Sequence, residues 1–139
     1  MIDRVLVPMD DSALSERALR YALDVHDGAQ ITVLHVVGEP SRMMGAATEI
    51  ALSDDSDERI RELAADVLDR AREIADEYDT TVDGEIEVGS PARKILDRAD
   101  SFDAVVMGTH GGSLADRLLV GNVAQTVFRR SPVPVTVVR

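Results

Sequence analysis

Four runs rich in apolar, mostly β-branched residues predict strands along the chain. They span residues 5–8, 31–37, 104–107 and 133–138. The first run shows no alternation of apolar and polar positions, and this is typical of a strand that is covered on both faces. Residues 82–88 differ, because apolar or small residues alternate there with acidic ones. This fifth strand is expected to bury one face only and to lie at an edge of the sheet.

Between the strands, apolar residues recur every three or four positions and predict four helices. The first follows the N-cap pair Asp11-Ser12 and is closed by Gly28. Its expected inward residues are Leu14, Ala18, Tyr21, Ala22 and Val25. The second carries a stripe over about five turns. This stripe consists of Ile60, Leu63, Ala64, Val67, Leu68, Ala71, Ile74, Ala75 and Tyr78.

The third and fourth helices are marked by their ends. Ser90-Pro91 is a cap followed by proline at the first helical position. The buried face of that helix is expected to hold Ala92, Ile95, Leu96 and Ala99. The last helix begins near Gly121-Asn122 and ends at Arg129-Arg130, where cations meet the negative end of the helix dipole. We expect Val123 and Val127 to point inward from it.

The alternation of strands and helices predicts an α/β fold with one open, parallel, five-stranded sheet, helices on both faces and right-handed crossovers. A flavodoxin-like order 2-1-3-4-5 would place the third strand in the centre, whereas the Rossmann-like order 3-2-1-4-5 places it outside. The one-sided third strand favours 3-2-1-4-5. In that order the winding reverses between strands one and four, and ligands bind beyond the carboxyl ends at such a point. Pro8-Met9-Asp10 and the loop from Gly108 would meet there.

Composition narrows the function classes. A chain of 139 residues fits one domain, 1–139, and the absence of cysteine excludes disulfides and thiolate metal sites. A net charge of −11 argues against a nucleic-acid partner. Lys94 is the single lysine among many aspartates, which favours a high-salt, halophilic cytoplasm. No signal segment and no apolar run of membrane length is visible, so we expect a cytoplasmic protein without a membrane partner.

Glycines after the fourth strand carry the candidate chemistry. Gly108, Gly111 and Gly121 fall as G-x-x-G-x9-G, the first two at a strand end and the third at a helix start. Glycines allow positive φ and close approach of backbone amides, and a helix N-terminus attracts anions. A phosphate chain would fit between the two glycine sites. The alternative is a tight turn and a helix start with no ligand.

Six landmarks in order resemble the universal stress protein family. They are Ile2 to Asp10 with Ser12, His35-Val36-Val37, 88–91, Met107-Gly108-Thr109-His110-Gly111, Gly121-Asn122-Val123 and 131–139. This resemblance implies the 3-2-1-4-5 sheet, a homodimer paired along the terminal strand and, in one branch of the family, binding of ATP, ADP or AMP, with Mg²⁺. The family is associated with regulatory binding in the stress response.

The resemblance also assigns roles to individual residues. It places Pro8, Met9 and Asp10 on the ribose and adenine side, with Asp10 accepting from a ribose hydroxyl or holding a metal through water. Val36 would touch the adenine ring. The phosphates would be held by Gly108, His110, Gly111, Gly121, Asn122 and Val123, and Met107 precedes this group in the same site.

Two departures from the family pattern bear on binding. Asp11 replaces a glycine and adds a negative charge near the expected phosphates, and Asn122 replaces a serine or threonine. The asparagine side chain can still donate to phosphate and cap the helix. Three of these residues also have a purely structural interpretation. Asp10 could cap the first helix, His35 could be a hydrogen-bonded core histidine, and His110 could be a loop residue that does not contact phosphate.

The residues suggest no enzyme. No nucleophile and base combine into a catalytic group, and the histidines are too few for a zinc site. The last strand ends without the lysine of a phosphoacceptor domain, and no Walker loop is present. The alternatives that stay open are a nucleotide-free dimeric interaction module of the same fold and a slow ATPase.

Overall fold

The computed structural model describes residues 1–38, 55–109 and 121–139. The chain order is β1 (Arg4–Pro8), α1 (Ala13–Val25), β2 (Gln30–Val37), α3 (Asp55–Glu77), β3 (Asp83–Val88), α4 (Pro91–Ala99), β4 (Ala104–Gly108), α5 (Asn122–Arg130) and β5 (Val135–Val138). In these ranges, no helix is both long enough and apolar enough to cross a membrane.

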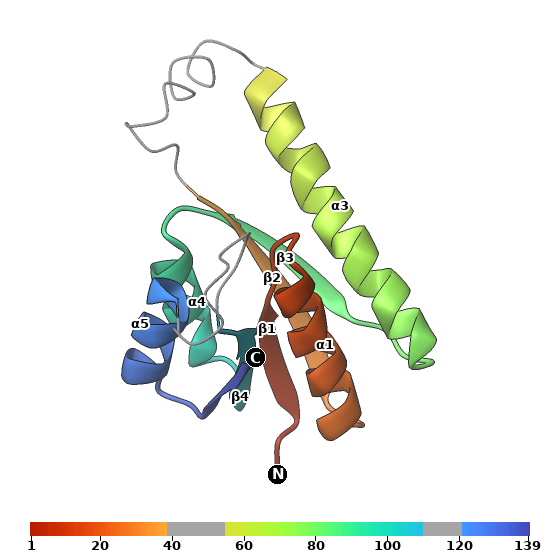
Figure 1. Cartoon of the computed structure of the whole chain (residues 1–139), viewed down its shortest axis with the longest axis vertical. Helices are drawn as coiled ribbons and strands as arrows, with labels where there is room; N and C mark the ends of the chain where they lie inside the picture. Colours follow the sequence, from red (N-terminus) through yellow and green to blue (C-terminus); the bar gives the residue numbers. More distant parts are fainter. Residues whose placement is uncertain (39–54, 110–120) are drawn as a thin grey trace.

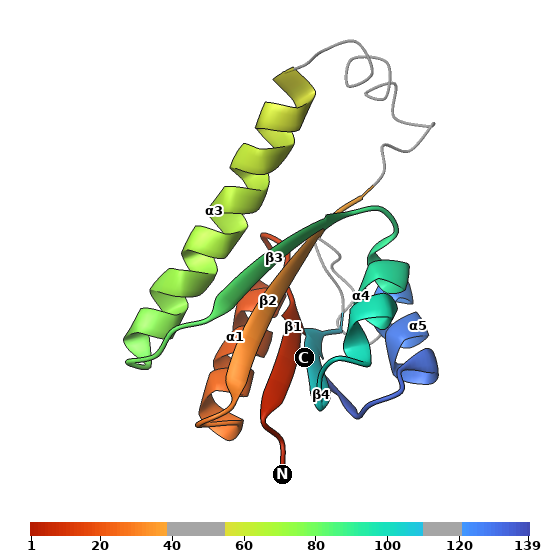
Figure 2. The ribbon, with the colours of Figure 1, turned by 180° about the vertical axis from the view of Figure 1, so that it is seen from behind.

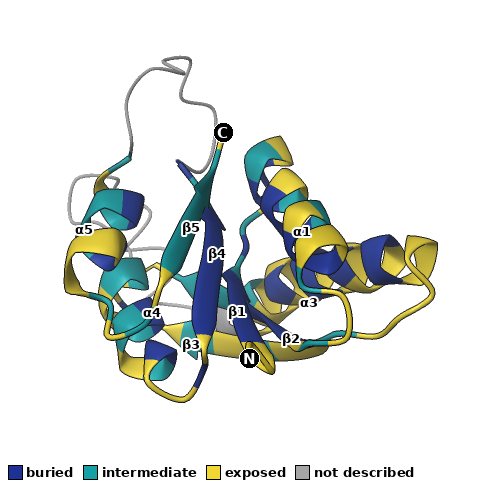
Figure 3. Cartoon of the chain, turned by 90° about the horizontal axis from the view of Figure 1, so that it is seen from below, coloured by how far each residue is buried: buried dark blue, intermediate teal, exposed yellow. Residues whose placement is uncertain are grey.

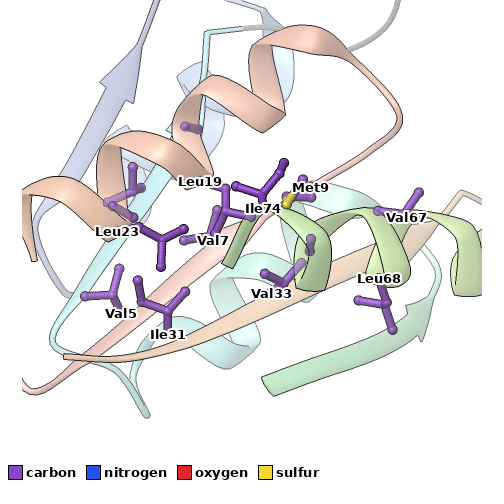
Figure 4. Close-up of a cluster of buried hydrophobic side chains, with 14 residues drawn as sticks. Val5, Val7, Met9, Leu19, Leu23, Ile31, Val33, Val67, Leu68 and Ile74 are labelled. Atoms are coloured by element: carbon purple, nitrogen blue, oxygen red, sulfur yellow. The ribbon is translucent and has the colours of Figure 1, made fainter. Parts of the chain in front are cut away.

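The described strands form a five-stranded parallel sheet in the order β3-β2-β1-β4-β5, as the sequence predicts. Helices α1 and α3 cover one face and α4 and α5 cover the other (Figures 1 and 3). Each face has its own hydrophobic cluster. Val5, Val7 and Val33 point toward α1 and α3 (Figure 4), whereas Leu6 and Leu34 point toward α4 and α5. The central strand β1 is thus buried on both sides, as its unbroken apolar run predicts.

The inward face of α1 agrees with the prediction only in part, since Ala18 and Ala22 are buried as expected. Ser12 is the N-cap, and its hydroxyl oxygen accepts from the Ser15 amide at 3.2 Å. Tyr21 and Val25, which were expected inside, are 39% and 54% exposed. The buried positions are Ser15, Ala18, Leu19, Ala22 and Leu23. The helix is therefore rotated so that its leucines, rather than Tyr21 and Val25, fill the space between the sheet and α3.

The stripe of α3 is confirmed over most of its length. Its buried residues are Ala64, Val67, Leu68, Ala71, Ile74 and Ala75. Leu63 and Tyr78 were expected inside as well, but they are 59% and 36% exposed. The first turns of α3 extend past the sheet (Figure 1), so the helix packs on the sheet through its later turns.

Strand β3 lies at the edge, as predicted (Figure 2), but the expected burial of the apolar face holds only at its first residue, Val82, which is half-buried against the core. Ile86 and Val88 are 42% and 56% exposed, while Glu85 is half-buried. Glu85 accepts two hydrogen bonds from Arg98 of α4, at 2.9 and 2.7 Å. An ion pair with α4 thus anchors the acidic face of this strand.

The last two helices agree with the prediction in their bounds. Pro91 begins α4, with Ile95 and Ala99 buried and Ala92 and Leu96 partly buried. In α5, Val127 is buried, Val123 is half-buried, and Arg129 and Arg130 occupy the last turn. Helices α4 and α5 pack side by side, and because each connects two parallel strands, their N-termini lie at the end of the sheet where β1 and β4 finish.

Candidate functional site

A pocket of about 410 Å³ opens beyond the carboxyl ends of β1, β2 and β4. Its lining residues are Pro8, Met9, Asp10, Ser15, Leu34, Val36, Pro91, Ile95, Met107, Gly108, Gly121, Asn122, Val123 and Ala124. The walls are mainly apolar, with a few polar groups from the β1–α1 loop and the start of α5. The site lies at the point where the winding of the sheet reverses between β1 and β4.

Nine of the eleven site residues predicted from the sequence line this pocket. They are Pro8, Met9, Asp10, Val36, Met107, Gly108, Gly121, Asn122 and Val123. The other two, His110 and Gly111, lie outside the described residues. The structure thus brings together residues from four separate parts of the chain, and their role in binding stays a prediction.

Sequence reasoning missed five further lining residues, which come from α1, β2, α4 and α5. These are Ser15, Leu34, Pro91, Ile95 and Ala124. Ile95 was expected only as a core residue, and it is buried while one side faces the pocket. Ser15 follows the cap Ser12 by one turn, and this hydroxyl spacing is the one local signal that could have identified it.

The β1–α1 loop is built around Asp10. One carboxylate oxygen of Asp10, Oδ1, accepts from the backbone amide of Ser12 at 2.8 Å. The buried Ser15 hydroxyl donates to the Asp10 carbonyl at 2.9 Å and is 3.3 Å from the Asp10 amide. The second carboxylate oxygen has no described partner. Asp10 therefore shapes the loop but does not cap α1, as its structural interpretation had it, because the N-cap is Ser12; its second oxygen is left for a ligand.

Backbone groups of Val36 face the pocket because β2 is longer than β1. The Met9 amide donates to the Leu34 carbonyl at 2.9 Å, whereas the Gly89 amide donates to the Val37 carbonyl at 2.9 Å. Successive residues of a strand direct their N–H and C=O groups to opposite neighbours. Val36 therefore directs both groups toward β1, where the chain has already turned away after Met9. One donor and one acceptor are presented side by side at the pocket.

The segment between β4 and α5 is tied at its base. The Gly121 amide donates to the Thr109 carbonyl at 2.6 Å, so the end of β4 and the start of α5 are held together. Gly121 is the N-cap, in an extended conformation with no side-chain cap hydrogen bond. The positive end of the α5 dipole, with Asn122 exposed beside it, is therefore at the rim of the pocket.

Gly108 is explained by packing rather than by positive φ. Among the described glycines, only Gly28 and Gly89 have positive φ. A Cβ on Gly108 would lie 3.0 Å from Leu14 Cγ and 3.4 Å from the Leu14 backbone. The missing side chain allows the first turn of α1 to approach the end of β4. The expectation that Gly108 serves a special backbone conformation is therefore wrong.

The second acidic residue of the first loop lies away from the site. Asp11 is exposed and is not among the residues that line the pocket. The charge that the sequence placed near a phosphate is therefore directed to solvent. Within the described residues, no group of three or more His, Asp and Glu side chains is arranged to hold a metal ion.

Comparisons with known proteins agree with this fold. A universal stress protein of Methanocaldococcus jannaschii is 29% identical, over 98% of this chain and 81% of that protein. The solved structure of the universal stress protein UspA from Lactobacillus plantarum superposes with a TM-score of 0.80 and 26% identity, over 99% and 98% of the two chains. A universal stress protein solved in complex with cAMP gives a TM-score of 0.69 and 26% identity, over 99% and 97%. The model of the Universal stress protein family matches residues 1–139, and the chain belongs to that family.

Proposed function

We propose that this protein binds an adenine nucleotide in the pocket at the ends of β1 and β4 and acts as a regulatory binding protein of the stress response. The observation that carries the proposal is the orientation of Val36. Adenine presents a donor at N6 and an acceptor at N1. These match the C=O and N–H groups that Val36 directs into the pocket.

The side chains around Val36 suit a flat aromatic base. Leu34, Ile95 and Met107 are buried and line the pocket, so a base that contacts them would be partly removed from water. Concave sites with apolar walls and a few well-placed polar groups are typical of small-ligand binding. The base would lie against β2 and α4, with the ribose toward the β1–α1 loop.

Polar groups at the rim suit the ribose and phosphates. The second oxygen of Asp10 would accept from a ribose hydroxyl, and it would also reach a water of a nucleotide-bound Mg²⁺. The start of α5 would receive the phosphates, because a helix N-terminus favours anions. Asn122 is exposed at that position and can donate from its side-chain amide. When bound, the magnesium ion would supply charge neutralisation between phosphates.

Relatives support the class of ligand. The universal stress protein solved with cAMP shares 26% identity and nearly the full chain with this one. ATP, ADP and AMP share the adenine that Val36 would recognise, so the proposal extends to all three. Slow hydrolysis of ATP is a weaker candidate, because no described side chain at the pocket is placed as a general base besides Asp10.

We also propose a homodimer paired through β5. This strand lies at the edge of the sheet, and its four residues are half-buried. An exposed edge presents unpaired backbone groups that another strand can satisfy. The alternative function, a nucleotide-free interaction module, predicts the same dimer. The two hypotheses therefore differ in whether the pocket binds a nucleotide, and not in how the β5 edges pair. The single-domain, high-salt and cytoplasmic interpretations rest on the sequence alone and stay predictions.

Calorimetric titration of the purified protein with ATP, ADP and AMP, with and without Mg²⁺ and in high salt, tests the proposal. We expect saturable binding of at least one nucleotide and a rise in melting temperature. Gly121→Val should abolish binding by placing a branched side chain at the phosphate end. Gly38→Val is the matched control, because a Cβ there meets nothing within 4 Å and Gly38 does not line the pocket. Absence of binding by the unaltered protein would favour the interaction module.

A further inference from the structure

The ring of His35 connects β2 to the loop that follows β1. Its Nδ1 atom lies 2.8 Å from the carbonyl oxygen of Met9. We infer that His35 is a positioning residue of the pocket, which fixes Met9 and the following Asp10 relative to Val36. The expected effect of His35 on nucleotide affinity rests on the proposed function. The hydrogen bond between His35 and Met9 is a feature of the ligand-free protein.

The hydrogen bond identifies one protonated nitrogen of the ring. A carbonyl oxygen can only accept, so the proton must be on Nδ1 of His35. The Nδ1–H tautomer is therefore assigned by geometry to the neutral ring. A side chain without a donor at this place would leave the Met9 carbonyl without this partner.

The contact continues the sheet beyond the end of β1. Pro8 pairs with Leu34 as the last residue of the β1–β2 ladder. The Met9 amide still donates to the Leu34 carbonyl at 2.9 Å, and His35 then holds the Met9 carbonyl. Both peptide groups of Met9 are thus bound to β2 before the chain turns away. The Met9 side chain is 4% exposed and packs with the cluster on the α1 and α3 face (Figure 4).

This arrangement sets the spacing between two proposed ligand contacts. Asp10 follows Met9, and Val36 follows His35, so each residue of the hydrogen-bonded pair precedes one residue that would touch the nucleotide. The Ser15 hydroxyl holds the peptide of Asp10 from the other side. Preorganisation of this kind lowers the ordering cost of binding. Without the His35 bond, the ribose contact at Asp10 would no longer be fixed to the base contact at Val36.

Three substitutions at one position separate the hydrogen bond from the bulk of the ring. His35→Asn places an amide donor near the position of Nδ1, His35→Gln places it near that of Nε2, and His35→Leu removes it. His26→Leu is the control, because His26 lies at the end of α1 and outside this pocket. AMP affinity is measured by calorimetry for all four variants. Two-dimensional ¹H–¹⁵N spectra of the histidine rings and amide exchange at Met9 and Asp10 are recorded on the ligand-free protein.

We expect His35→Leu and His35→Gln to bind AMP about tenfold more weakly, which corresponds to about 1.4 kcal/mol. His35→Asn should restore affinity to within about twofold, as a donor at the Nδ1 position predicts. The spectra should show the Nδ1–H tautomer, and exchange at Met9 and Asp10 should accelerate in the leucine variant. Equal affinities for the asparagine and glutamine variants, or an Nε2–H tautomer, would overturn the inference. If the unaltered protein binds no nucleotide, the proposed function fails, and unaccelerated amide exchange in His35→Leu then rejects the positioning role independently.

Discussion

Exchange of the base for hypoxanthine tests how the pocket reads adenine. IMP differs from AMP at the six position, where a carbonyl oxygen replaces the amino group and N1 carries a proton. Acceptor and donor are thereby exchanged along the edge that would face Val36. With IMP, the Val36 carbonyl would meet an oxygen and the Val36 amide would meet an N–H group. The two backbone groups then have no partner on the ligand.

The expected loss follows from the burial of these groups. An unsatisfied buried donor or acceptor costs about 1–3 kcal/mol. Val36 is half-buried and the pocket is open at its rim, so water will partly solvate both groups. We therefore use about 1–1.5 kcal/mol for each group, or about 2–3 kcal/mol for the pair. That difference makes IMP about 30- to 150-fold weaker than AMP.

Calorimetric titration of both nucleotides measures this ratio. Purine riboside monophosphate, which lacks the amino group but keeps the N1 acceptor, should lose about five- to twelvefold, near the square root of the IMP effect. Val36→Ala is the matched control, because it removes methyl groups and leaves the backbone in place. AMP and IMP should then weaken together, by about 1 kcal/mol each, and their ratio should persist. An IMP affinity within threefold of that for AMP would refute recognition through Val36.

Three further predictions concern the stability of the fold and the β5 edge. Gly108→Ala should lower the free energy of unfolding by about 1–3 kcal/mol in urea titrations, because the new Cβ meets Leu14 at 3.0 Å, and Leu14→Ala should reduce that loss. Hydrogen bonds from the backbone amides of Asp3 and Arg4 lower the pKa of the Asp103 carboxyl from its ordinary 3.8. The resulting stabilisation is present above pH 3.8 and is lost as pH falls through the lowered pKa, so the stability difference between wild type and Asp103→Asn should shrink in acid. Val137→Pro should give monomers in sedimentation while keeping the fold, because the alternation of backbone groups along β5 directs the Val137 amide to the free edge. Thr136→Pro should instead unfold this edge of the sheet, since the Thr136 amide is directed toward β4.

Local patterns were sufficient for the order of the sheet. An uninterrupted apolar run identifies β1 as central, and the acidic alternation in 82–88 identifies β3 as an edge. The same patterns could not predict which face of a strand a neighbouring helix would cover. Ile86 and Val88 repeat like a buried face but remain exposed, because the burial of an edge strand depends on how far α3 reaches.

Helix α1 shows the same limit in another form. Ala18, Tyr21 and Val25 form one possible apolar stripe of the helix. Ala18, Leu19 and Leu23 form a second one. Both stripes have helical spacing, so periodicity alone does not choose between them. The choice is made by contacts with α3 and the sheet, which lie far away in the sequence. The lining residues Ser15 of α1 and Ile95 of α4 were missed for this reason, whereas residues directly after strands were found because strand ends converge in a parallel sheet.

The two described glycines of the motif carry different constraints. Gly108 is required by the approach of Leu14, which would exist without any ligand, whereas Gly121 caps α5 and ties it to Thr109 at the rim of the pocket. A glycine pattern therefore cannot distinguish a tight strand–helix junction from a phosphate site. The groups that favour a nucleotide are those with no hydrogen-bond partner among the described residues, namely the pocket-facing edge of Val36 and the second oxygen of Asp10. Substitution at Gly108 would test the fold, and only ligand changes at the Val36 edge and substitutions at the α5 start test the function.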